Sequence, residues 1–126
     1  MEQSNFYYLR GMNHIEIGGV QHPLLFNMIA IENVMDEIHV QNFDELSSHI
    51  SMATVSKSLK FSRVCAFHGI KAGYRKTGET FPLEDIDDLA DAIQSFFEVE
   101  PALQAFTKAV EEFFKPRKKP SAKSGK

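Results

Sequence analysis

Residues 15–26, IEIGGVQHPLLF, alternate apolar and polar side chains around a Gly-Gly pair. A two-residue glycine turn favours a β-hairpin, because type I′ turns need positive φ at both central positions. In the resulting register Ile17 faces Val20, and Ile15 faces His22. An isolated hairpin is only marginally stable, so its apolar face must pack on helices or on strands of another subunit. The chain therefore has to build the rest of its fold around one short hairpin.

The two faces of this hairpin differ in polarity. The apolar face carries Ile15, Ile17, Val20, His22, Leu24 and Phe26, and the other carries His14, Glu16, Gln21 and Pro23. Pro23 has no N–H to donate to a ladder, which favours an edge position for its strand. An open edge pairs readily with a further strand, so Ile15, Ile17 and Val20 are candidates for a subunit contact.

Beyond residue 26 the apolar residues recur every three or four positions, which predicts helices. We expect these helices at 28–38, 43–52, 55–73, 83–97 and from Pro101 to about residue 114. Asn27 and Asn42 are the predicted N-caps of the first two, and Gly73 or Gly78 ends the third. The predicted fold is mainly α: a small single domain with an N-terminal β-hairpin followed by four to five short helices.

The chain has 126 residues, which is enough for one domain. We divide it into an N-terminal extension at 1–11, a folded domain at 12–114 and a disordered basic tail at 115–126. The single cysteine excludes an intrachain disulfide. The sequence has no apolar run of the roughly 20 residues that a membrane span needs, and no signal-peptide pattern. We therefore expect a soluble protein of the cytoplasm.

The net charge of −3 hides a strong asymmetry. The last twelve residues hold 6 of the 14 basic residues and no acid, so residues 1–114 carry 8 bases and 17 acids, a net charge of −9. Residues 46–78 contain six bases and no acid, whereas residues 79–112 contain ten acids and one base. Either the basic and acidic elements pack together within the chain, or they meet across subunits or partners.

No group of residues predicts catalysis, a metal site or a cofactor. Cys65 and His68 share a helix face, but no third group is placed to hold the imidazole, so a buried structural thiol is the favoured interpretation. The histidines lack the spacing of a zinc site. The acids at the start of the fourth predicted helix lack the spacing of a calcium loop and favour the helix dipole instead.

Two kinds of binding remain. Lys57, Lys60, Arg63, Lys71 and Arg75 are the candidate partner-binding residues, since with the tail they form the main positive charge of the chain. They would suit a small nucleic-acid-binding regulator that uses residues 57–76 and the tail, although the acidic body and the lack of a helix-turn-helix signature oppose this. The alternative is protein binding, because 11 phenylalanines and 5 methionines supply many apolar stripes.

Four segments, taken in order, resemble the small tail assembly chaperones of long-tailed bacteriophages and phage-like gene transfer agents. The first is the hairpin pattern I-x-I-G-G-x-x-x-P-L-x-F at 15–26, and the second is a helix with a glutamate, here Glu32. The third is the alanine- and glycine-containing segment 66–75, and the fourth is G-x-x-F-x-L-E-D-I-x-D-L at 78–89. The resemblance covers about residues 12–114 and is carried by order and spacing.

This resemblance implies a non-enzymatic role. Such chaperones are thought to coat the helical tape measure protein and to recruit tail tube subunits. They tend to self-associate, act in the host cell cytoplasm and are not expected in the mature virion. Many are also made in a longer form by translational frameshifting. The expectation is therefore a homo-oligomeric assembly chaperone that binds the tape measure protein and the tail tube protein, without a cofactor.

Overall fold

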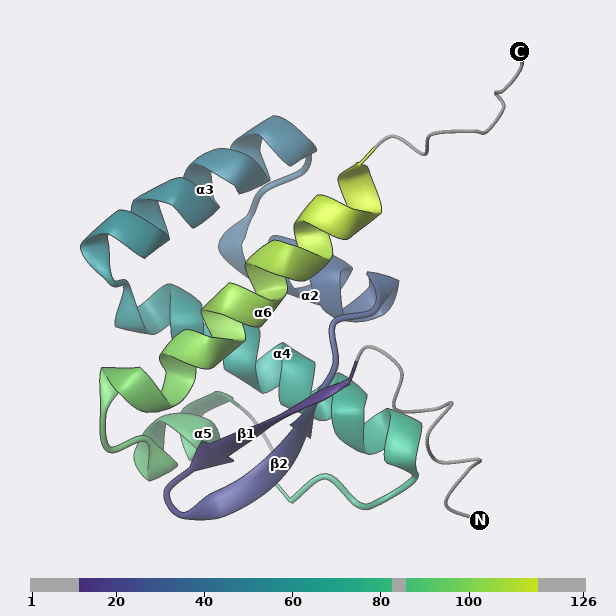
Figure 1. The fold of residues 1–126 in the computed structure, drawn as a ribbon, viewed down its shortest axis with the longest axis vertical. Coiled ribbons are helices and arrows are strands. Elements are labelled where there is room, and N and C mark those ends of the chain that lie inside the picture. Colours follow the sequence, from purple (N-terminus) through teal and green to yellow (C-terminus); the bar gives the residue numbers. More distant parts are fainter. Residues whose placement is uncertain (1–11, 83–85, 116–126) are drawn as a thin grey trace.

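The computed structural model describes residues 12–82 and 86–115. Its elements are β1 (Asn13–Ile17), β2 (Val20–Leu24), α2 (Met28–Ile38), α3 (Phe43–Ser56), α4 (Leu59–Thr77), α5 (Ile86–Ala92) and α6 (Phe96–Phe114). The mainly helical fold with an N-terminal hairpin is thus confirmed. The hairpin and α3 lie at opposite ends of the molecule, and α6 crosses α4 between them (Figure 1). The predicted extension at 1–11 and all of the predicted tail except Lys115 lie outside the described residues.

The hairpin has the predicted register. Ile17 pairs with Val20 and Ile15 with His22 in an antiparallel two-stranded sheet. Gly18 and Gly19 have φ values of 60° and 83°, which are the positive angles that a two-residue hairpin turn requires. The predicted turn is therefore correct at the level of backbone angles.

The assignment of the two hairpin faces is wrong at two positions. Val20 is 53% exposed, whereas Pro23, assigned to the polar face, is buried. The reason is tertiary packing: β2 contacts α4 and β1 contacts α6, so the hairpin is covered on more than one side. A Cβ built on Gly73 would lie 2.7 Å from the carbonyl carbon of Pro23. Because Gly73 has no side chain, the backbone of β2 can pack directly against α4.

The turn of the hairpin is fixed to the start of α6. The N–H of Gly18 donates to Glu98 Oε2 at 3.1 Å, and the N–H of Gln94 donates to Glu98 Oε1 at 2.7 Å. These backbone hydrogen bonds, first that of Gln94 and then that of Gly18, hold the pKa of Glu98 below its ordinary value. One carboxylate thus joins two parts of the chain that are 80 residues apart.

The first two helices begin where their caps were predicted. Asn27 Oδ1 accepts from the N–H of Ala30, and Asn42 Oδ1 accepts from the N–H of Glu45. The second predicted helix was too short, because α3 continues to Ser56 and ends at Lys57 in the left-handed conformation. The third predicted helix began too early, because residues 55 and 56 belong to α3. Ser58 caps α4, which starts at Leu59.

The boundaries of the last helices were also wrong. Residues 83–85 lie outside the described residues, α5 ends at Ala92, and α6 begins at Phe96. Pro101 was expected to start the last helix but lies inside it. The hydroxyl of Ser95 accepts from the N–H of Phe97, and Glu98 follows three residues after this cap. A Ser-x-x-Glu pattern starts helices, and here it outweighs the proline that follows.

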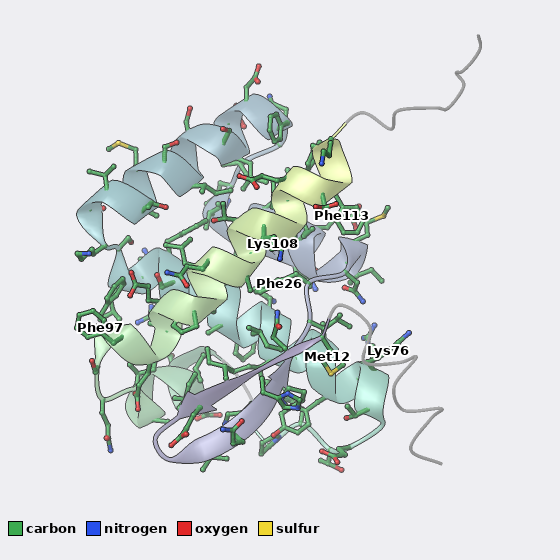
Figure 2. All side chains as sticks on the ribbon, viewed as in Figure 1. Met12, Phe26, Lys76, Phe97, Lys108 and Phe113 are labelled. Carbon is green, nitrogen blue, oxygen red and sulfur yellow. The ribbon has the colours of Figure 1, made fainter. Side chains whose placement is uncertain are left out.

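The core lies where α4, α6 and the hairpin meet. Phe106 of α6 has no exposed surface, and its ring lies 5.4 Å from that of Phe26 and 5.9 Å from that of Phe61 (centroid distances). Phe26, labelled in Figure 2, follows the hairpin and lies beneath α6 in that view. The free Cys65 and Val34 are also fully buried. A chain of aromatic contacts therefore connects three elements that are distant in sequence.

A buried polar pair lies between β2 and α4. His22 Nδ1 and Tyr74 Oη form a hydrogen bond of 2.8 Å, and both residues are buried. Burial lowers the pKa of His22, because the cationic imidazolium would lose its hydration. The pKa of Tyr74 is raised, first by burial and to a smaller extent by the nearby negative charge of Glu79. Both side chains are therefore neutral in the folded protein near pH 7.

We expect this pair to make the protein less stable as the pH falls. Below about pH 6.5 the unfolded chain takes up a proton at His22 that the folded chain excludes, so the free energy of unfolding falls by up to about 1.4 kcal/mol per pH unit. Above that pH the contribution is constant. Urea titrations from pH 5 to 8 should show that His22→Gln flattens this slope. His14→Gln, at an exposed position of the same hairpin, controls for the loss of one imidazole; equal slopes in both variants would contradict the assignment.

Candidate functional site

The five candidate basic residues do not form one continuous surface. Lys57 is the left-handed C-cap of α3, whereas Lys60 and Arg63 lie in the first two turns of α4. Lys71 and Arg75 lie near the other end of α4, about 16 Å and about 22 Å from Lys60 along the helix at 1.5 Å per residue. The turns between them, 64–67, are buried in the core. A ligand that bound all five residues would therefore have to bridge a stretch where α4 is covered.

Two of the five, Lys71 and Arg75, line a common hollow. Lys71 and Arg75 border a small hollow of about 50 Å³ beside the start of α2, which Asn27, Asn33 and His68 also line. His68 Nε2 lies 2.7 Å from Glu37 Oε1 at the end of α2. The contact between Glu37 and His68 joins α2 to α4 next to the hollow that Lys71 and Arg75 border.

The three candidate edge residues divide into core and surface. Ile15 and Ile17 are 3% and 1% exposed and belong to the hydrophobic core. Val20, at the turn, is the exposed member of the three. The side chains of Ile15 and Ile17 are therefore packed inside this subunit, and of the three candidates only Val20 exposes apolar surface.

A larger apolar groove lies between α2 and the C-terminal end of α6. It has a volume of about 560 Å³ and is lined by Met28, Ile31, Glu32, Met35, Asp36, Val40, Gln41, Phe113 and Phe114. Met28, Phe113 and Phe114 are 57%, 48% and 45% exposed. Figure 2 shows Phe113 near the C-terminal end of α6. We call this surface the α2–α6 groove.

Two adjoining hollows lie on another side of α6, against α3. They have volumes of about 380 and 470 Å³ and share Thr54, Thr107 and Glu111. Val55, which lines the first, is 83% exposed. Serine and threonine contribute four of the nine residues that line the first hollow, beside the apolar Phe43, Ile50, Val55 and Val110. We call them together the α3–α6 hollows.

A ridge of two aromatic rings separates the two surfaces. Phe114 lines the α2–α6 groove, Phe43 lines the α3–α6 hollows, and their ring centroids are 4.8 Å apart. Apolar surface of this kind, rimmed by polar residues, is typical of protein-binding sites. At the opposite end of α6, Phe97 is 69% exposed (Figure 2). Exposed apolar side chains thus lie on both flanks of the C-terminal half of α6: Phe113 and Phe114 on one, and Phe43 and Val55 of α3 on the other.

The sequence did not distinguish the groove residues from the core. Met28, Ile31, Met35 and Ile38 form a regular stripe, but the buried residues of α2 are Ala30, Ile31 and Val34. Ile31 is buried, and Met35 and Ile38 pack partly buried against the core, so Met28 is the one exposed member of this stripe. The one available signal was the excess of large apolar residues in α2 and α6 over what so small a domain can bury.

The Cys65–His68 pair lacks the environment of a reactive thiol. Cys65 is fully buried, and burial raises the pKa of its thiol well above its ordinary value. Reactive cysteines are instead accessible and have a lowered pKa. Within the described ranges there is no group of three or more metal-binding side chains, and no helix is long and apolar enough to cross a membrane.

Comparison of the chain with protein-family models, with curated proteins and with solved structures finds no match.

Proposed function

We propose that this protein is a tail assembly chaperone of the kind used by long-tailed bacteriophages. In this role it binds the tape measure protein, keeps it soluble and recruits tail tube subunits, without catalysis. The proposal extends to a homo-oligomeric state and to action in the host cytoplasm before the virion is complete. It is supported by the order of the sequence patterns at 15–26, 66–75 and 78–89.

The observation that carries the proposal is the exposed apolar surface on both flanks of α6. A long amphipathic helix exposes an apolar stripe that aggregates unless another surface covers it. The α2–α6 groove offers methionine and phenylalanine side chains, which adapt to varied apolar partners. A protein that must cover many different turns of one long helix needs such an adaptable surface.

The charge distribution supports reversible binding. Residues 1–114 carry a net charge of −9, and charged surfaces speed association more than they slow dissociation. Partly exposed apolar side chains contribute less binding energy than a fully desolvated interface. Modest affinity of this kind allows polymerising tube subunits to displace the chaperone.

Co-expression with a tape measure protein is the direct test. Wild-type chaperone should raise the soluble fraction of the tape measure protein and co-purify with it. The double variant Met28→Ser/Phe113→Gln removes two half-exposed side chains and should weaken binding by about 30-fold, since about 2 kcal/mol of apolar burial is lost. Val20→Thr, at an exposed apolar position of the hairpin, is the matched control.

Two outcomes would count against the proposal. If the wild-type protein neither solubilises the tape measure protein nor co-purifies with it, the assigned role is wrong. If Val20→Thr impairs binding as much as the groove variant does, the apolar groove is not the surface responsible.

A further inference from the structure

The α2–α6 groove is long enough to hold one more helix. Met28, Ile31 and Met35 lie at positions i, i+3 and i+7 of α2, so they form one stripe along the helix. Such a stripe normally faces another helix, yet Met28 is 57% exposed. Phe113 and Phe114 form the opposite wall. The 11 residues of α2 span about 16 Å, which corresponds to three turns of a docked helix.

The rim of this groove is acidic. Glu32 and Asp36 lie one turn apart on α2, both are exposed, and no lysine or arginine is among the residues that line the groove. Within the described part of the chain, neither carboxylate has a hydrogen-bond or ion-pair partner. By contrast, Glu37 on the same helix contacts His68. The two rim carboxylates are therefore available to a partner.

We infer that the α2–α6 groove binds an amphipathic helix whose apolar stripe is flanked by lysine or arginine. The apolar stripe of the partner packs on the methionines and phenylalanines, and its flanking cations pair with Glu32 and Asp36. An acidic helix is repelled by the same rim, so the carboxylates select the partner as well as bind it. This inference rests on the proposed function and names the surface and the partner chemistry that it uses.

Synthetic helical peptides test the charge rule directly. Three labelled 18-residue peptides would be compared by fluorescence anisotropy: a leucine and methionine stripe flanked by lysines, the same stripe flanked by glutamates, and the lysine peptide with its stripe scrambled. We expect the lysine-flanked peptide to bind at least about tenfold more tightly than the other two. Its affinity should fall as salt screens the rim charges.

Charge reversal at the rim should reverse this preference. Glu32→Lys/Asp36→Lys is expected to weaken binding of the lysine-flanked peptide by about tenfold or more and to strengthen binding of the glutamate-flanked one. Glu16→Lys/Asp91→Lys changes the net charge equally at two exposed sites outside the groove, and should alter either affinity less than threefold. Circular dichroism and thermal unfolding establish that both variants are folded. An unchanged preference in the rim variant, or an equal change in the control, would overturn the inference.

The basic segment of the chain itself is the main competing occupant, because Lys115 directly follows Phe114. A protein that ends at Lys115 tests this. If it binds the lysine-flanked peptide within threefold of the full chain, the groove is open to a partner. A gain of more than tenfold would show that the segment at 116–126 occupies the groove, and the inference would fail.

The co-expression test keeps this inference separate from the proposed function. If the rim variant still solubilises the tape measure protein, the groove assignment is wrong while the chaperone role stands. If wild-type protein binds the lysine-flanked peptide but does not solubilise the tape measure protein, the groove assignment stands and the chaperone role is wrong.

Discussion

Replacing Phe106 with alanine is expected to lower the free energy of unfolding by about 3–5 kcal/mol. Phe106 has no exposed surface, and its ring contacts those of Phe26 and Phe61. Truncation removes the apolar surface that these rings bury and leaves a cavity where α6, α4 and the end of the hairpin meet. A domain of this size has only about 5–15 kcal/mol in total, so the variant should lose a large fraction of its stability.

Urea denaturation measures this loss, and thermal unfolding should show a fall of about 4–8 °C for each kcal/mol. Phe97→Ala is the matched control, because Phe97 lies on the same helix and is 69% exposed. Its effect should stay within about 0.5 kcal/mol. If the free energies of unfolding of the two variants differ by less than about 1 kcal/mol, Phe106 does not hold the core together as its ring contacts indicate.

Replacing Gly73 with alanine is expected to have the second largest effect, a net loss of about 1–3 kcal/mol. The new Cβ would lie 2.7 Å from the carbonyl carbon and oxygen of Pro23, so backbone must move. Alanine favours a helix over glycine by about 1 kcal/mol, and the clash must exceed this gain. The hairpin should therefore separate from α4, with faster amide exchange in β1 and β2.

Gly69→Ala provides the comparison, because its Cβ would meet the ends of the Phe26 and Leu24 side chains, which can adjust more readily than backbone. We expect it to lose less stability than Gly73→Ala in the same urea titration. A Gly73→Ala variant as stable as the wild type would show that β2 can shift along α4 without cost.

Local signals predicted the local structure well. The two glycines gave the turn and register of the hairpin, and Asn27 and Asn42 gave the starts of α2 and α3, because each of these features acts within a few residues. Pro101 was misleading, since a proline is common at a helix start but a Ser-x-x-Glu pattern at Ser95 came first. Both signals are present in the sequence, and the Ser-x-x-Glu pattern is the one that starts α6.

Tertiary contacts decided what periodicity left open. Pro23 is buried because Gly73 lies against it, which no pattern within the hairpin indicates. Likewise the stripe that begins at Met28 has the spacing of a core face, yet Met28 is exposed because it borders the groove between α2 and the end of α6. The candidate basic residues were identified by composition alone, and the burial of the middle of α4 separates them.

The hydrogen bond between Gly18 and Glu98 can form only late in the synthesis of the chain. The two residues are 80 positions apart, and ribosomes add about 5–20 residues per second, so the hairpin waits about 4–16 s for its partner. During that interval neither the core around Phe106 nor the wall formed by Phe113 exists. A nascent chain thus has no α2–α6 groove, which forms only as the last helix leaves the ribosome. Translation itself therefore sets when the groove is complete.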